Sequence, residues 1–559
     1  MARFVSGLLL LVSIQSSYSA FVREQQDVSG YATVALDNGT FVGISEGSVS
    51  IFRGIPYARP PIGDLRLRLP VASDPYISTY NATAFGASCI QQVNSDKNMT
   101  GLNPAAVQVL DGVLDGSNFI NNDDEDCLTI NVYTPANATK DSRLPVVYWI
   151  YGGGFENGET AMYNGSVIVE RALQLDHPVV YVSVNYRLSA LGFLGGIEAQ
   201  QAGVGNLGLQ DQRLGLRWVQ KYISAFGGDP TKVIIWGESA GAFSVALQMV
   251  TNNGDNEGLF RGAFMQSGSP SWFGPNTMQG GQASFNQLAN VTGCGSLLGN
   301  VTVFNCLRNV STADFRSAIQ ASSSIFDYAS LNLAWMPRID GLFLTDSPHQ
   351  LVLDGSVANV PFITGDCDDE GTLFSLSNSN ITTENELRQY LPQFFPFSVN
   401  SSDLDAILSA YPEDPTLGSP FGTGTKNAIT PQFKRLAAIL GDLVFQAPRR
   451  AFLSERSANT TAFAFLSKKL KSTPILGASH NTDLQDIFGP GELTDALVNF
   501  ATNLDPNGPT LIDWPAYTID APTMLAVSNG NVTQELVNDT FRAEGMQVLM
   551  QVALNNSVS

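Results

Sequence analysis

One short turn limits what this chain can fold into more than any other segment. The apolar run Lys232–Ile235 is typical of a strand, and the small apolar residues of Ala242–Leu247 are typical of a helix. Between them stands the pattern G-x-S-x-G, with Ser239 flanked by Gly237 and Gly241. Glycine at both positions lets strand and helix approach closely and forces a sharp, strained turn. We therefore interpret Ser239 as a nucleophile held clear of the sheet. A tight structural turn is the alternative.

The charge balance and the start of the chain narrow the class of protein. The formal net charge of −21 argues against nucleic acid and anionic membrane surfaces, because both favour basic patches. Residues 1–20 are predicted to be a removed secretory signal, since Arg3 precedes the short apolar run Gly7–Val12 and small residues follow. No later stretch is long and apolar enough for a membrane helix. No composition break divides residues 21–559, so we expect one domain there.

Glycosylation sequons and cysteines indicate which cellular compartment the protein occupies. Asn-x-Ser/Thr sequons are dense along the chain, which agrees with a secreted glycoprotein in an oxidising compartment. Cys294 and Cys306 enclose a short loop, which favours a local disulfide; a bridge between Cys89 and Cys127 would anchor a longer excursion. The sequence does not fix this connectivity. Cys367 is left over, and we interpret it as a buried, unreactive thiol rather than a nucleophile. No closely spaced Cys or His ligands indicate zinc.

The order of apolar segments predicts the fold class. Residues 31–53 alternate apolar and polar side chains between two turns, which predicts a small antiparallel meander. From about Leu128, apolar strands alternate with helical segments, which predicts an α/β protein with a mostly parallel sheet covered on both faces. The strands expected there are 144–150, 178–184, 233–236, 262–267, 360–365 and 463–466, and residues 209–223 have helical spacing.

A serine hydroxyl becomes a good nucleophile only when a base takes its proton, and this base is usually a histidine oriented by a carboxylate. The chain has three histidines. His480 lies in a small-residue loop after the late strand, and such loops face the site edge of a parallel sheet. Where a nucleophile elbow is present, the base follows the serine and the acid along the chain. We therefore assign His480 as the base, and interpret His177 and His349 as surface or capping residues.

The acid is expected on a strand-end loop between the serine and the base. The segment Gly365–Gly371 follows the strand at 360–364 and meets this condition. Its four carboxylates are those of Asp366, Asp368, Asp369 and Glu370. Chemistry alone does not choose among them, and three are expected to be solvated or to brace the loop.

Three consecutive glycines follow the strand at 144–150. Flexible backbone in Tyr151–Phe155 can turn N–H groups toward the developing negative charge of a tetrahedral intermediate, and the N–H of Ala240 is aimed at the same space. Losing one such donor typically costs about 3–4 kcal/mol of transition-state stabilisation. A phosphate-binding loop is the alternative, but the segment lacks both the G-K-[ST] ending and the G-x-G-x-x-G spacing.

With these blocks in order, the sequence resembles the type B carboxylesterase/lipase family, which includes the cholinesterases and, more similar to this chain, the secreted fungal lipases and sterol esterases. The resemblance covers most of the chain and implies an α/β-hydrolase fold. Besides the elbow and the triple-glycine loop, the matching blocks are Phe52–Ala58 with Pro60 and Pro61, Glu125–Val132, Asn185–Arg187 with Gly192–Leu194, Gly205–Arg213, Phe226–Pro230, Asp369–Gly371 and Trp514 with Pro515.

The resemblance implies roles that the residues alone leave open. Glu370, which matches the Asp-Glu-Gly acid of the family, is implied to be the carboxylate that orients His480. The implied oxyanion donors are the N–H groups of Gly153, Gly154 and Ala240. The implied disulfides are Cys89–Cys127 and Cys294–Cys306, the first closing a flap at about residues 89–127. No metal and no organic cofactor is required.

The sequence of the flap indicates which substrates to expect. Residues 102–114 are strongly apolar and compatible with a helix, so a mobile flap over the pocket could meet lipid with its apolar face when open. A static, glycosylated cover is the alternative, since Asn98 is a sequon. No tryptophan lies between Cys89 and Cys127, so the cation-binding aromatic expected of a cholinesterase is missing there, and choline esters are not expected.

Together these features predict a secreted serine ester hydrolase that acts through an acyl-enzyme on hydrophobic esters, with Ser239, Glu370 and His480 as its catalytic residues. An esterase of aromatic esters such as feruloyl esters is the alternative within the same class. A catalytically dead adhesion protein of the neuroligin type is the alternative of another class, although such relatives typically lose the nucleophile or the base. The expected partners are an ester or lipid substrate, a transient lipid interface at the flap, and a second copy of the chain.

Overall fold

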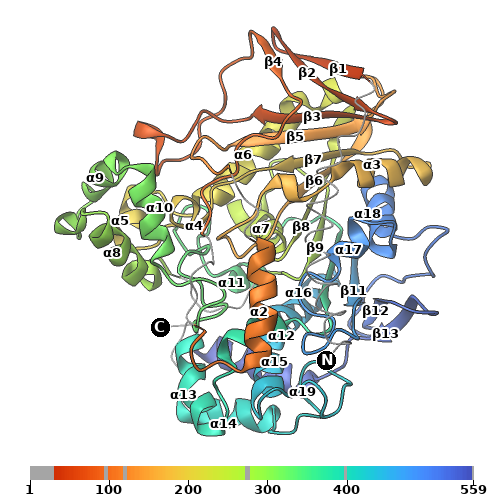
Figure 1. Ribbon diagram of the computed structural model, residues 1–559. Helices are drawn as coiled ribbons and strands as arrows, with labels where there is room; N and C mark the ends of the chain where they lie inside the picture. The colour runs from red at the N-terminus through yellow and green to blue at the C-terminus, as the bar shows by residue number, and fades with distance from the viewer. Residues whose placement is uncertain (1–29, 93–98, 118–121, 271–276, 396–398, 557–559) are drawn as a thin grey trace.

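The computed structural model describes residues 30–92, 99–117, 122–270, 277–395 and 399–556. The predicted signal at residues 1–20 and the sequon at Asn98 therefore lie outside the described residues. A twisted sheet crosses the molecule from its N-terminal to its C-terminal strands, with helices on both sides (Figure 1). Among the described residues, no helix combines the length and the apolar character that crossing a membrane requires.

Within the described residues the sheet has thirteen strands, one of which, β4 (Thr79–Asn81), pairs with β2 outside the main path. Side by side, the strands on this path are β1 (Gly30–Leu36), β2 (Gly39–Glu46), β3 (Val49–Pro56), β5 (Thr129–Pro135), β7 (Val180–Val184), β6 (Leu144–Ile150), β8 (Gly228–Glu238), β9 (Gly262–Gln266), β10 (Phe362–Cys367), β11 (Ala462–Lys468), β12 (Thr523–Ser528) and β13 (Gln534–Asn538). From β7 to β12 all neighbours are parallel. These parallel neighbours confirm the predicted α/β class.

The predicted meander is present, but it is continuous with the large sheet. Strands β1, β2 and β3 pair antiparallel in sequence, and β3 then pairs antiparallel with β5. Outward-facing residues of β1 are exposed, as expected for an edge strand with one face in water, whereas every residue of β5 is buried. The meander thus extends the core sheet rather than forming a layer of its own.

Consecutive strand residues point to opposite faces of the sheet. Where both sets are apolar, both faces must be covered, and helices cover them here. In β6, the Tyr148 hydroxyl donates to the Gln212 carbonyl (2.9 Å) on one face, while the ring of Trp149 packs on Phe488 (5.1 Å between centroids) on the other. The helix predicted at 209–223 is α6 (Leu207–Tyr222). It packs against α7 (Ala240–Val250).

The remaining helices lie around the sheet and at the edges of the molecule (Figure 1). They are α2 (Pro104–Ser117), α3 (Gly165–Gln174), α4 (Ser189–Gly192), α5 (Ile197–Ala202), α8 (Gln282–Val291), α9 (Val303–Asn309), α10 (Thr312–Gln320), α11 (Pro348–Leu353), α12 (Gly371–Phe374), α13 (Glu384–Phe394), α14 (Ser401–Ala410), α15 (Phe433–Gly441), α16 (Ala447–Arg456), α17 (Leu484–Ile487), α18 (Glu492–Asn503) and α19 (Ala543–Asn556). In Figure 1, α5, α8, α9 and α10 form a lobe at one side, and α13, α14, α15 and α19 gather at the base.

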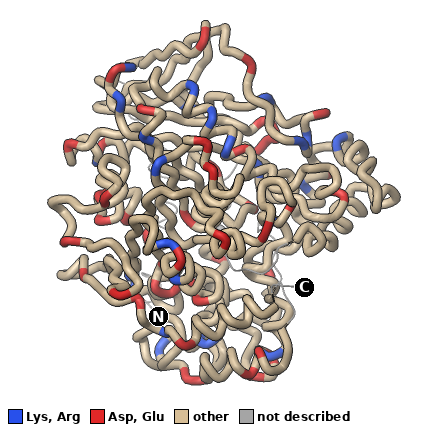
Figure 2. The backbone as a smooth tube through the Cα atoms, turned by 180° about the vertical axis from the view of Figure 1, so that it is seen from behind, with Lys and Arg blue, Asp and Glu red and all other residues tan. Residues whose placement is uncertain are grey.

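Both disulfides implied by the family resemblance are present. Cys89 is bonded to Cys127, and Cys294 to Cys306. Cys367 is a free thiol, fully buried at the end of β10, and burial raises its pKa well above the ordinary value. The prediction that the leftover cysteine is buried is thus confirmed, and the high pKa of its thiol agrees with low reactivity. Lys and Arg positions are scattered among more numerous acidic ones along the backbone (Figure 2).

Candidate active site

Ser239 stands at a strained turn between β8 and α7. Its backbone has φ 54° and ψ −125°, a conformation that few residues other than glycine adopt. A Cβ on Gly237 would collide with the backbone of Gly241, and one on Gly241 would collide with the carbonyl oxygen of Ile150 in β6. The two glycines are therefore required by close packing, as the pattern predicted.

Three side chains far apart in sequence meet at this turn. The Nε2 atom of His480 lies 2.8 Å from the Oγ atom of Ser239, and its Nδ1 atom lies 2.5 Å from Oε2 of Glu370. The three residues are 8%, 5% and 1% exposed in the order serine, histidine, glutamate. Each hydrogen bond is thus shielded from water, while the serine keeps some access to its surroundings.

The four carboxylates at the end of β10 and in the loop after it differ in their partners. Asp366 binds the Arg449 guanidinium (2.8 Å), and Asp368 pairs with Lys471. Asp369 accepts from the N–H of Ala478 (2.8 Å), and the Ala478 carbonyl accepts from the Asp369 N–H (2.9 Å). Glu370 alone of the four is bonded to His480. Three of the carboxylates therefore brace the loop, as expected.

The reciprocal bonds between Asp369 and Ala478 join the acid loop to the histidine loop. They form one residue before Glu370 and two residues before His480, so they hold the two functional side chains opposite each other. Asp369 also accepts from Lys471 at 2.7 Å. We regard Asp369 as a positioning residue.

Two further buried carboxylates lie close to His480, and the sequence reasoning missed both. Oε1 of Glu238, the residue before the serine, is 3.4 Å from Nε2. Burial raises the pKa of Glu238 to about 8 and that of Asp483 to about 6. Burial by itself would lower the pKa of His480, but the charge and hydrogen bond of Glu370, with smaller contributions from Glu238 and Asp483, raise it to about 9. The sequence did offer a sign of Glu238, because it is the residue directly before the serine in the G-x-S-x-G pattern and must therefore lie near the site.

The triple-glycine loop lies against the serine. A Cβ on Gly152 would come within 2.7 Å of the Glu238 carbonyl oxygen and 2.9 Å of the Ser239 Cβ, so only glycine fits there. Gly153 and Gly154 have φ values of 99° and 65°. Among the described residues, no acceptor is found for the N–H groups of Gly153, Gly154 or Ala240, and Ala240 begins α7. These donors are available to a ligand.

An apolar pocket of about 90 Å³ opens at the serine. Gly154, Ser239 and Ala240 form part of its wall. Its apolar lining comes mainly from α7 and from residues 325–348, and includes Phe155, Phe243, Leu247, Ile325, Leu331 and Leu344. The polar or charged residues among its lining are Ser239, Ser269 and Arg338.

The other two histidines lie away from this pocket. His177 is half-buried before β7 and does not line the pocket. His349 is buried in the first turn of α11, 6% exposed, and burial lowers its pKa to about 3. The interpretation of His349 as a surface or capping residue was wrong, because its side chain is buried with Val352 one turn on, and Ser347 caps the helix.

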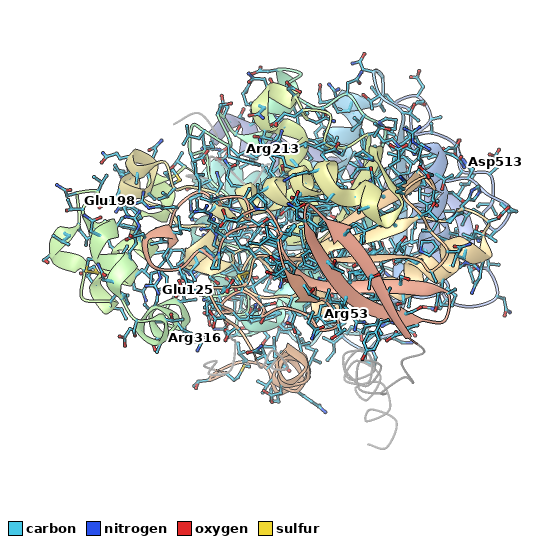
Figure 3. All side chains as sticks on the ribbon, turned by 90° about the horizontal axis from the view of Figure 1, so that it is seen from above. Arg53, Glu125, Glu198, Arg213, Arg316 and Asp513 are labelled. Atoms are coloured by element: carbon cyan, nitrogen blue, oxygen red, sulfur yellow. A yellow bond between two sulfur atoms is a disulfide. The ribbon has the colours of Figure 1, made fainter. Side chains whose placement is uncertain are left out.

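The helix of the predicted flap packs on a cluster outside the pocket lining. Ala106, Val109 and Leu110 of α2 pack on a small cluster that is separate from the main core. The other members of this cluster are Leu373, Leu376, Phe433, Ile475 and Leu476. No residue of α2 is among those that line the pocket. Seen from above, α2 stands at the rim of the molecule (Figure 3).

Comparison with known proteins places this geometry in a family. The profile of the carboxylesterase family matches residues 31–546. Lipase 4 of Diutina rugosa is 41% identical over 504 residues, which cover 88% of this chain and 90% of that protein. Secreted lipase 1 of Botryotinia fuckeliana is 40% identical over 541 residues, covering 93% and 92% of the two chains. The crystal structure of Aspergillus niger EstA superposes with a TM-score of 0.78 at 27% identity, over 95% of this chain and 99% of that one. The chain therefore belongs to the carboxylesterase family, has the α/β-hydrolase fold, and is a carboxylic ester hydrolase.

Proposed function

We propose that the protein is a secreted serine hydrolase that cleaves hydrophobic carboxylic esters through an acyl-enzyme. The observation that carries this proposal is the hydrogen-bonded chain from Ser239 through His480 to Glu370, which opens on an apolar pocket. The names of relatives support it, since they include lipases and secreted lipases. The two disulfides also agree with an oxidising, extracellular compartment.

In the first half of the reaction, His480 Nε2 takes the proton of the Ser239 hydroxyl while its oxygen attacks the ester carbonyl. Glu370 holds the Nδ1 proton, fixes the tautomer, and stabilises the imidazolium that forms. The carbonyl oxygen becomes negative, and the N–H groups of Gly153, Gly154 and Ala240 are proposed to stabilise it. The imidazolium then gives its proton to the alcohol, which leaves.

In the second half, water enters the pocket and His480 takes a proton from it. The resulting hydroxide attacks the acyl carbon, the same amide hydrogens stabilise the second tetrahedral intermediate, and Ser239 leaves with the proton from the imidazolium. All proton transfers in this cycle pass through Nε2, which is why the Nδ1 partner must stay fixed.

The flap is proposed to contact a lipid surface transiently. Helix α2 has an apolar inner face, and this face packs on a small cluster that is separate from the main core. Asn103 holds the start of the helix through one hydrogen bond to the Ile429 carbonyl (2.9 Å) and one from its N–H to Ser379 (3.1 Å). Movement of α2 would have to break these two hydrogen bonds and the packing on this cluster.

A substrate panel tests this function. Nitrophenyl esters of increasing acyl length, a triglyceride emulsion and methyl ferulate are compared, each below and above the concentration at which an interface forms. Turnover of the longer esters and activation by the interface are expected. Turnover of methyl ferulate alone would overturn the hydrophobic-ester proposal, and absence of fluorophosphonate labelling at Ser239 would overturn the serine mechanism.

A further inference from the structure

One buried glutamine contacts both the strand that leads to the nucleophile and the loop that follows the base. Gln266 ends β9, and its side chain is fully buried. Its Oε1 atom accepts from Nε1 of Trp236 in β8 (2.6 Å), and its Nε2 atom donates to Oδ2 of Asp483 (2.7 Å), three residues after His480. Trp236 and Asp483 are fully buried too, so both hydrogen bonds form away from water.

The orientation of this amide is fixed by its two partners. An indole N–H can only donate, so the amide oxygen of Gln266 must face Trp236 and the NH₂ group must face the carboxylate of Asp483. Burial raises the pKa of Asp483 to about 6, which leaves the carboxylate ionised at neutral pH. A hydrogen bond to an ionised group is roughly twice as strong as one between neutral groups. The contact between Gln266 and Asp483 is therefore strong as well as directional.

The main chain of Gln266 holds the nucleophile as well. Its carbonyl oxygen accepts from the Ser239 N–H (2.8 Å). One residue thus bonds to three segments of the chain: to β8 through the ring of Trp236, to the strained turn through the serine N–H, and to the loop after His480 through Asp483.

The loop that carries His480 is held on both sides of the histidine. Before it, Ala478 exchanges two hydrogen bonds with Asp369, the residue next to the acid. After it, Asp483 bonds to Gln266, the residue whose carbonyl holds the serine. The first contact fixes the base relative to the acid, and the second fixes it relative to the nucleophile.

We propose that Gln266 is a positioning residue that keeps Nε2 of His480 in line with the hydroxyl of Ser239, acting through Asp483. The Nε2 and Oγ atoms are 2.8 Å apart, a distance that permits direct proton transfer. Neither Gln266 nor Asp483 is among the described residues that line the pocket, so substrate binding is expected to be independent of both. This inference rests on the proposed serine esterase mechanism and adds a residue that supports it.

The first variant removes both side-chain hydrogen bonds of the glutamine at nearly constant volume. Gln266→Met should lower kcat for nitrophenyl butyrate about 10- to 100-fold, since a displacement of about 1 Å typically costs about 100-fold in rate. The KM should stay unchanged. Gln248→Met is the matched control, because Gln248 is equally buried but bonds to Leu209 and Arg213 of α6. It should lower stability toward urea without lowering kcat.

The second variant restores the bond with donor and acceptor exchanged. In Gln266→Glu/Asp483→Asn, the carboxylate at position 266 can accept from Trp236 and from the amide at position 483, and the number of buried charges is unchanged. This double variant should have a much higher kcat than Gln266→Met. The carboxylates that raise the pKa of His480 are those of Glu370, Glu238 and Asp483, so kcat is compared at the alkaline plateau of each pH profile.

Three results would overturn the proposal, each obtained with variants that circular dichroism shows to be folded. The first is a Gln266→Met protein with the kcat of the unaltered protein. The second is a loss that lies in KM rather than in kcat. The third is an exchanged pair that is no faster than Gln266→Met. A role in stability alone would not make kcat depend on which partner donates.

Should either variant fail to fold, two substitutions of Asp483 decide. Asp483→Asn keeps an oxygen that accepts from Gln266, whereas Asp483→Leu is similar in size and has none. The asparagine variant should have a kcat about 10- to 100-fold above that of the leucine variant. Equal kcat values contradict the proposal. Failure of the esterase mechanism gives a different result, since the unaltered protein would then neither hydrolyse the ester nor be labelled by a fluorophosphonate at Ser239.

Discussion

Replacing Glu370 by glutamine should reverse the tautomer of His480. The Oε1 atom of Glu370 accepts from the Ser267 hydroxyl and from the Cys367 N–H, both at 2.6 Å. The backbone N–H can only donate, so the oxygen of a glutamine amide must occupy the Oε1 position. Its NH₂ group then faces Nδ1 of His480, which is 2.5 Å from Oε2 in the structure. Nδ1 must accept, and the ring proton moves to Nε2.

A proton on Nε2 blocks the transfer from Ser239, because a protonated nitrogen cannot act as the base. In serine proteases the equivalent Asp→Asn change lowers kcat about 10,000-fold through the same error of tautomer. That factor corresponds to about 5.5 kcal/mol of lost transition-state stabilisation. We expect a loss of the same order for Glu370→Gln.

The assay is the burst of nitrophenol from nitrophenyl butyrate, with circular dichroism to confirm that the variant is folded. The rate of acylation should fall, and so should the rate of fluorophosphonate labelling. Asp368→Asn is the matched control, since Asp368 lies in the same loop and pairs with Lys471 (2.5 Å) rather than with His480. A folded Glu370→Gln protein with less than a tenfold loss would refute the tautomer argument.

Three further predictions concern the turn, the pH profile and acid stability. Gly241→Ala should abolish the burst and lower the melting temperature, because its Cβ meets the carbonyl oxygen of Ile150; a fully active variant would contradict this. The pKa of His480 is raised to about 9, in part by Glu238, so kcat/KM should rise with pH into the alkaline range. Glu238→Gln removes negative charge and should move that rise to lower pH; an unchanged profile speaks against the coupling. Burial alone would raise the pKa of Asp539, but Arg449 and Arg450 lower it well below the ordinary value of 3.8. The ionised carboxylate therefore stabilises the fold above pH 3.8, and this stabilisation is lost as the pH falls through the lowered pKa. Asp539→Asn should therefore lower the free energy of unfolding by about 3–5 kcal/mol at neutral pH, measured by urea denaturation, and the difference should shrink in acid.

Most strands were predictable because they are buried on both faces and read as continuous apolar runs. Strand β13 (Gln534–Asn538) was not, since it is an edge strand whose residues are largely exposed and mixed in polarity. Strand β12 (Thr523–Ser528) did carry an apolar signal that the sequence reading passed over. The continuity of the meander with the core sheet depends on the pairing of β3 with β5, which local pattern does not encode.

The site divides in the same way between local and long-range information. Ser239 was predictable from its own turn, and His480 from its position in the chain order and the scarcity of histidines. The acid was not predictable from chemistry, because four carboxylates lie within the short segment Asp366–Glu370. What distinguishes Asp366 from Glu370 is the position of Arg449 in α16, a partner that lies 83 residues away along the chain. Only the family resemblance supplied the choice.

The order of strands explains why the three proposed catalytic residues can be so far apart in sequence and still meet. β8, β9, β10 and β11 are consecutive and parallel in the sheet, and the serine, acid and base follow β8, β10 and β11. The strand between them, β9, links the turn to the acid: the Gln266 carbonyl accepts from the Ser239 N–H (2.8 Å), and the Ser267 hydroxyl donates to Glu370. A displacement of β9 would therefore disturb nucleophile and acid together. Strand β9 carries no catalytic side chain, but Gln266 and Ser267 at its end help to fix the positions of Ser239 and Glu370.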